Sequence, residues 1–145
     1  MKKIILTAVL VVLMGCSQEI LIEPVFNTVD DVFKWVIENI EYTLDKEDSW
    51  QSPQQTYNLK SGHCSDMALL EMYFLNEMNI ESEMYWVRFK ISFSDNSHAL
   101  VLVKNETIPR NSTSLSYITP SCYEIIRITS YKQSLEYAER IKTTQ

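Results

Sequence analysis

Glycine is unusually scarce in this chain of 145 residues. The sequence holds two glycines, Gly15 and Gly62, whereas average usage of about 7% would give about ten. Gly62 lies two positions before Cys64. Since glycine permits turns and close backbone approaches that other residues resist, we expect Gly62 to form one of these at that cysteine.

Basic residues are also in short supply. The chain has 13 lysines and arginines against 19 aspartates and glutamates, which gives a formal net charge of −6. Proteins that bind nucleic acid or an anionic membrane face need a basic surface, so the composition argues against nucleic acid as a partner. The sequence contains no internal repeats.

The N-terminal hydrophobic run is too short to span a bilayer comfortably. Met1-Lys2-Lys3 precedes the apolar residues 4–14, as in a signal peptide. Leu13-Met14-Gly15-Cys16 resembles the lipobox of bacterial lipoproteins, which implies that residues 1–15 are removed and that Cys16 becomes the lipidated first residue. By the same resemblance, Ser17 favours anchoring to the outer membrane, facing the periplasm. An ordinary secretory signal is the alternative.

Removal of the leader leaves a short tether over residues 16–27 and a single domain over residues 28–145. Two thiols remain in the mature chain, Cys64 and Cys122. In an oxidising compartment they could form a disulfide, but we interpret Cys122 as a small buried residue. A zinc site from His63, Cys64, Asp66 and His98 fits no standard ligand spacing, so we expect no metal and no other cofactor.

Helical periodicity precedes strand periodicity along the domain. Thr28 and Asp31 form a potential capping box before a first amphipathic helix. Helices are predicted at residues 29–44, 64–79 and 131–142, and strands at 84–91, 98–103, 115–119 and 123–129. The strand at 98–103 is apolar on both faces and is therefore predicted to be interior. This order indicates an α+β fold in which N-terminal helices pack on an antiparallel sheet.

The most informative residues are Cys64 and His98. Cys64 begins the second predicted helix, and His98 begins an alternating strand 34 positions later. A helix N-terminus favours a thiolate, and a neighbouring imidazole can accept the thiol proton. An α+β arrangement would bring these two ends together, as a thiol nucleophile and its base require.

The sequence around these residues resembles the transglutaminase-like superfamily of papain-type cysteine enzymes. That family has a pattern of Gly-x-Cys-x-Asp-x-Ala-x-Leu, followed by a strand that begins His-Ala. The matching residues are Gly62, Cys64, Asp66, Ala68, Leu70, His98 and Ala99, and residues 50–56 resemble the lead-in of bacterial members. The resemblance covers about residues 30–121 and implies a papain-like core.

The resemblance implies a peptidase or amidase that acts on a peptide or protein substrate. Cys64 would attack a carbonyl and His98 would protonate the leaving amine. The family strand that ends in Asp-Pro aligns with Thr119-Pro120, so Thr119 is expected as the third triad member, with Asn105 as an alternative. Because Thr119 carries no charge, a second hypothesis stays open: a non-catalytic binding module with a vestigial site.

Other residues near Cys64 receive supporting roles. We interpret His63 as part of the pocket rim and Asp66 as a helix-capping carboxylate. The Cys64 backbone N–H is a potential oxyanion donor, and a second donor could come from Trp50, Gln54 or Gln55.

Overall fold

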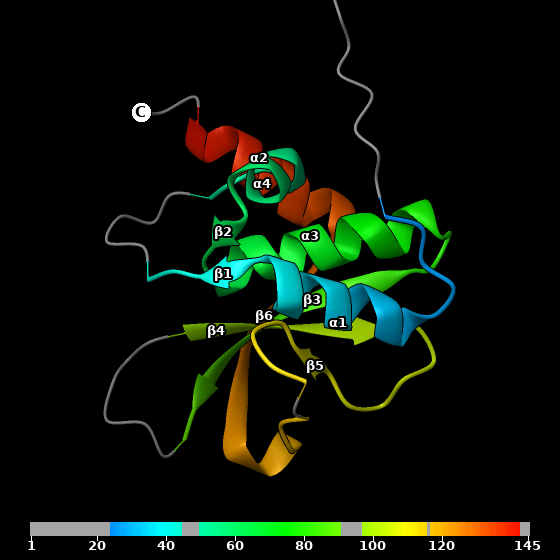
Figure 1. Ribbon diagram of the computed structural model, residues 1–145. Coiled ribbons are helices and arrows are strands. Elements are labelled where there is room, and N and C mark those ends of the chain that lie inside the picture. Colours follow the sequence, from blue (N-terminus) through cyan, green and yellow to red (C-terminus); the bar gives the residue numbers. More distant parts are fainter. Residues whose placement is uncertain (1–23, 45–49, 91–96, 116, 143–145) are drawn as a thin grey trace, which may run out of the picture.

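The computed structural model describes residues 24–44, 50–90, 97–115 and 117–142 (Figure 1). The predicted signal peptide, Cys16 and most of the tether lie outside these residues, so the structure leaves those predictions as they stand. Within the described ranges, no helix is both long and apolar enough to cross a membrane.

Helices cover one face of a small sheet (Figure 1). The helices are α1 (Val29–Asn39), α2 (Pro53–Leu59), α3 (Cys64–Glu77) and α4 (Tyr131–Lys142), with a 3₁₀ turn, η1, at Pro120–Cys122. The strands are β1 (Glu41–Tyr42), β2 (Ser61–Gly62), β3 (Ser82–Phe89), β4 (Ser97–Val103), β5 (Arg110–Asn111) and β6 (Tyr123–Ser130). This arrangement confirms the predicted α+β class.

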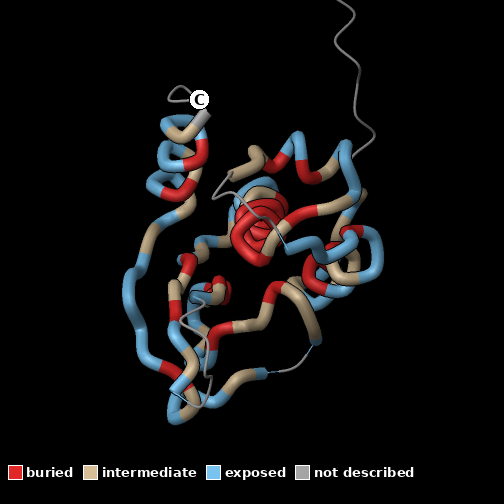
Figure 2. The backbone as a smooth tube through the Cα atoms, turned by 90° about the vertical axis from the view of Figure 1, so that its left-hand side faces the viewer, coloured by how far each residue is buried: buried red, intermediate tan, exposed pale blue. Residues whose placement is uncertain are grey.

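Helix α3 forms the centre of the domain. Every residue from Cys64 to Met72 is buried, and Figure 2 shows this helix as a buried coil surrounded by the other elements. A helix that is apolar around most of its circumference is stable only in an interior. It contacts α1, α2 and α4 as well as β3 and β4, so its first residue is fixed relative to the sheet.

The main sheet has the strand order β5-β4-β3-β6, and all neighbouring strands are antiparallel. The predicted interior position of the His98 strand is confirmed, since β4 lies between β5 and β3. β1 and β2 form a separate parallel pair, in which Tyr42 pairs with Gly62. This small pair places the chain before α2 beside the start of α3.

Most predicted elements form, with two differences. The capping box is present: the Thr28 hydroxyl accepts from the Asp31 N–H at 3.2 Å, and the Asp31 carboxylate accepts from the Thr28 N–H at 2.9 Å. The first helix ends at Asn39, earlier than predicted, because Ile40 is extended and leads into β1. The predicted strand at 115–119 is wrong: Tyr117 makes an isolated bridge to Arg110, and the preceding polar segment contributes β5 instead.

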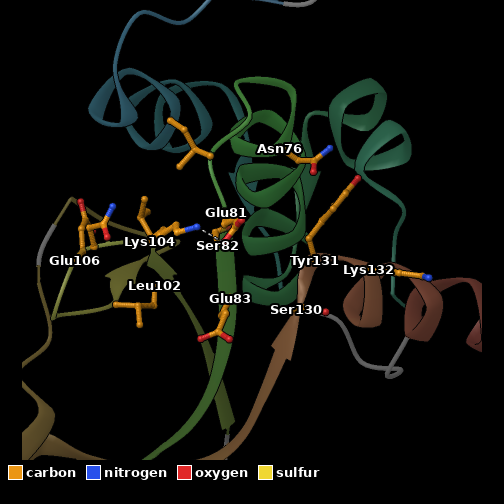
Figure 3. Close-up of a pocket in the computed structure, with 13 residues that line it drawn as sticks. Asn76, Glu81, Ser82, Glu83, Leu102, Lys104, Glu106, Ser130, Tyr131 and Lys132 are labelled. Atoms are coloured by element: carbon orange, nitrogen blue, oxygen red, sulfur yellow. Dashed lines mark hydrogen bonds and ion pairs between the residues drawn. The ribbon is translucent and has the colours of Figure 1, made fainter.

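One cavity, of about 450 Å³, lies far from the proposed chemistry (Figure 3). It is bounded by Asn76 near the end of α3, by Tyr131 at the start of α4, and by Glu81, which pairs with Lys104 at 2.7 Å. Asn76 is twelve residues along α3 from Cys64, which corresponds to about 18 Å. Within the described ranges no cysteine or histidine lines this cavity, and Cys64 lies at the other end of α3.

Candidate active site

The start of α3 is held by a buried carboxylate. Asp66, which is 1% exposed, accepts from the His63 backbone N–H at 2.9 Å and from the Gln51 backbone N–H at 2.8 Å. The predicted capping role of Asp66 is therefore confirmed. The second bond also ties the segment that begins at Trp50 to the first turn of α3, so one side chain positions both sides of the site.

Gly62 makes the close approach predicted for it. A Cβ atom on Gly62 would lie 2.9 Å from the Asp66 Cβ and 3.2 Å from the Thr56 Cγ2. Real Cβ atoms avoid such distances, because cores are packed to van der Waals contact. Glycine is therefore required here by space around the capping carboxylate.

Cys64 is the first residue of α3, and its side chain is 1% exposed. Burial raises the pKa of its thiol, and the Asp66 charge adds to this effect, whereas hydrogen bonds from the Ala99 and Ser65 backbones oppose it. A helix start favours the thiolate, but burial has the larger effect on this thiol and favours the protonated form. Cys64 and Ala99 belong to the same buried cluster, so the start of α3 packs against β4 at the residue that follows His98.

His63 is closer to the sulfur than the sequence predicts. Its Nδ1 lies 3.3 Å from the Cys64 Sγ, so these neighbouring side chains do not diverge. The Tyr42 ring lies 5.8 Å from the His63 ring. Burial raises the pKa of Tyr42, with a smaller contribution from the Cys64 charge, which places Tyr42 near the sulfur as well.

His98 is oriented by an asparagine. Its Nε2 lies 2.8 Å from the Asn111 Oδ1. The same oxygen accepts a hydrogen bond from the Thr113 backbone N–H at 3.1 Å. Since a backbone N–H can only donate, the Asn111 atom beside the imidazole is an acceptor. The His98 Nε2 must therefore carry the proton, which leaves Nδ1 as the basic nitrogen. A neutral imidazole in this tautomer can accept the thiol proton.

Asn111 is itself fixed by its surroundings. It lies on β5 opposite Leu100 of β4, and its Nδ2 donates to the Ser114 hydroxyl at 2.9 Å. Burial lowers the pKa of His98, the bond to Asn111 opposes this shift, and the charge of His63 adds to it. His98 is therefore a weaker base than a free imidazole, and it releases a proton more readily once it is charged.

The structure corrects the prediction for Thr119. The Thr119 hydroxyl lies 3.1 Å from the Cys122 sulfur and 3.4 Å from the Ser121 hydroxyl, just before η1. β5 pairs with β4 and carries Asn111, which occupies the position next to the imidazole that the sequence pattern predicted for Thr119. Asn105, the alternative, is a residue with positive φ in the turn after β4.

The remaining predictions near the site have mixed outcomes. Cys64 and Cys122 are free thiols, so the structure does not contain the alternative disulfide. Gln54 and Gln55, two of the suggested oxyanion donors, make hydrogen bonds within α2 and its N-cap. Trp50, the third, packs against the core cluster that contains the first residues of α3. Among the described residues, no group of three or more histidine, cysteine, aspartate or glutamate side chains could hold a metal ion.

The sequence did not indicate Asn111 as the residue that contacts the His98 ring. It lies in the polar run Asn111-Ser112-Thr113-Ser114, which is typical of a loop, and β5 is two residues long. A two-residue strand has no period to detect. The one signal in the sequence is that Asn111, soon after the His98 strand, has a side chain able to accept a hydrogen bond from an imidazole.

Comparisons with known proteins agree with this fold. A family model described as a transglutaminase-like domain matches residues 13–108, well over half of the chain. A proposed cysteine protease from Cytophaga hutchinsonii has a similar structure (TM-score 0.51, 19% identity), covering 70% of this chain and 41% of its own. LapG from Legionella pneumophila, in an EGTA-treated form, is also similar (TM-score 0.56, 15% identity), covering 68% of this chain and 59% of its own. The chain therefore spans less than two thirds of either structure, and the likeness shows the fold. The comparison with curated proteins found no match.

Proposed function

Because the chain belongs to the transglutaminase-like domain family, we propose that it is a cysteine peptidase or amidase with the triad Cys64, His98 and Asn111. The contact between the His98 Nε2 and the Asn111 Oδ1 supports this most strongly, because it leaves the basic nitrogen free. Cys64 also packs in the same buried cluster as Ala99, the residue next to His98.

The reaction begins from a neutral pair, since burial raises the pKa of the thiol and lowers that of the imidazole. As the Cys64 sulfur attacks the carbonyl carbon, the thiol proton passes to the His98 Nδ1. The protonated imidazole then gives this proton to the leaving nitrogen, the C–N bond breaks, and a thioester remains. Water hydrolyses the thioester to a carboxylic acid and restores the thiol, or a second amine forms a new amide.

Substrate access requires a side-chain movement. Cys64 is 1% exposed, and the His63 ring lies against its sulfur. Rotation of His63 about its side-chain bonds would open the nearest approach without any change in the backbone. We propose that bound substrate replaces this ring beside the sulfur.

A binding module with a vestigial site is the second candidate. The burial of Cys64 and the uncharged amide of Asn111 favour it, because a neutral partner stabilises imidazolium less than a carboxylate does. Alkylation by iodoacetamide, located by mass spectrometry, separates the two. An enzyme should lose most of its Cys64 alkylation in His98→Ala, whereas a module should be alkylated at the same rate with or without His98.

Turnover tests the enzyme directly. The full chain should release peptides from denatured casein, or incorporate dansylcadaverine into it. Cys64→Ala and His98→Ala should abolish these activities, and Asn111→Ala should reduce them about 10-fold to 1000-fold. Cys122→Ala and Thr119→Ala are matched controls that should retain activity. Full turnover by Cys64→Ala would show the proposal to be wrong.

We also propose that the domain is anchored by lipid at Cys16 on the outer membrane, facing the periplasm. The sequence Leu13-Met14-Gly15-Cys16 supports this. In a double-membraned bacterial host, metabolic labelling with an alkyne fatty acid should mark the wild-type protein. Cys16→Ala should lose the label, and an equally labelled Cys16→Ala protein would contradict the proposal.

A further inference from the structure

A second hollow, of about 290 Å³, lies between Trp50, the strands β3 and β6, and α4. Its lining combines three aromatic side chains, Trp50, Trp86 and Tyr137, with two arginines, Arg127 and Arg140. One carboxylate, Glu136, also lines it. Two basic residues against one acidic residue make this a locally basic hollow in a chain whose net charge is −6.

The aromatic residues form a continuous wall. The Trp50 ring lies 5.2 Å from that of Trp86 and 4.9 Å from that of Tyr137. Such a wall offers apolar surface to the stem of a ligand side chain. Trp50 and Trp86 are also two of the three tryptophans in the chain, so their fluorescence can report on the hollow.

The charged side chain of Arg127 lies beside this aromatic wall. It lies directly opposite Trp86 in the pairing of β3 and β6, so the two side chains project from the same face of the sheet. Its guanidinium lies 5.8 Å from the centre of the Tyr137 ring. Arg127 is exposed, and it forms no ion pair with any residue in the described ranges.

The hollow is connected to the candidate active site across the sheet. Trp86 pairs with Ala99, and Trp86 and Trp50 pack against the buried cluster that contains Ala99 and Cys64. Arg127 and Ala99 are therefore separated by two strand spacings, or about 10 Å. An extended peptide covers this distance in about three residues. Trp50 adds a second connection, since Gln51 is bonded to Asp66 at the start of α3.

We propose that this hollow is a substrate subsite that selects an aspartate or glutamate two to four residues from the bond that Cys64 attacks. The substrate carboxylate binds the Arg127 guanidinium, whose forked donors match two carboxylate oxygens. The stem of that side chain packs on Trp50 and Trp86. The substrate class is thus a peptide with an acidic side chain near the cleaved bond, and this inference rests on the proposed peptidase function.

Cleavage-site profiling tests the preference. A denatured bacterial proteome is digested with the full chain, and new termini are identified by mass spectrometry with Cys64→Ala as the blank. Acidic residues should be enriched about fivefold at one position within four residues of the cleaved bonds, the ratio for an exposed ion pair. Arg127→Gln should lose this enrichment, and Lys132→Gln, which removes a charge elsewhere on α4, should keep it. Cleavage without acidic preference, or a preference that survives Arg127→Gln, overturns the subsite.

A binding measurement separates failure of the subsite from failure of the proposed function. Should the wild type cleave nothing, the peptidase proposal fails, and the subsite is tested on Cys64→Ala with two acetylated heptapeptide libraries that differ only in one Glu or Gln. Tryptophan fluorescence should show about fivefold tighter binding of the Glu library, lost in Arg127→Gln. Equal affinities for the two libraries would overturn the subsite as well.

Discussion

The replacement Glu71→Gln should change how the stability of this domain depends on pH. Glu71 lies on α3 and is 0% exposed. Burial raises the pKa of its carboxyl from 4.5 to about 8, while Ser112 and the charge of Arg110 act in the opposite direction. Neither carboxyl oxygen has a partner in hydrogen-bonding geometry among the described residues, so the Ser112 hydroxyl is near but does not compensate for burial.

The sign follows from the protons bound in each state. An unfolded Glu71 releases its proton near pH 4.5, whereas the folded residue keeps it to about pH 8. The contribution of Glu71 to stability is therefore fully present below pH 4.5 and is lost as the pH rises to about 8. A full pH unit in this window costs about 1.4 kcal/mol. Because the unfolded and the folded residue are each only partly titrated at one end of the range, the total between pH 5 and pH 8 is about 3.5 kcal/mol.

Urea denaturation at pH 5, 6, 7 and 8 measures this effect. The free energy of unfolding of Glu71→Gln, minus that of the wild type, should rise by about 3.5 kcal/mol across the series, because the amide has no proton to lose. Glu77→Gln on the same helix is the matched control, since Glu77 is exposed, and its difference should stay nearly constant. A Glu71→Gln difference that is flat with pH would show that Glu71 does not keep its proton when the protein folds.

Three further substitutions test the site itself. Asn111→Asp places a carboxylate beside the His98 Nε2, so the pKa of His98 should rise by about 1 to 2 units in an NMR titration, and an unchanged pKa would contradict the observed contact. Gly62→Ala places a Cβ 2.9 Å from the Asp66 Cβ and should lower the free energy of unfolding, measured in urea, by about 1 to 3 kcal/mol. An unchanged free energy of unfolding would mean that the first turn of α3 can shift to make room for the methyl group. His63→Ala removes the ring 3.3 Å from the Cys64 sulfur and should speed alkylation of Cys64 several-fold, and slower alkylation would indicate that His63 activates the thiol instead of covering it.

The sequence by itself determined which elements carry the two residues proposed to react. Cys64 at a helix start and His98 near a strand start follow from the periodicity of apolar residues, which depends on residues a few positions apart. The need for Gly62 was visible from its rarity, and the structure supplied the reason, its contact with Asp66. The α+β order of elements and the interior position of β4 were likewise predictable.

Tertiary structure decided which groups complete the site. Asn111 reaches His98 because β5 pairs with β4. Strand pairing joins residues that are distant in sequence, and a two-residue strand has no sequence pattern that predicts it. The sequence pattern placed Thr119 there, but packing turned its hydroxyl to Cys122. Burial is also a property of the whole fold: it keeps Cys64 a thiol and raises the pKa of Glu71, since both effects come from the exclusion of water by neighbours distant in sequence.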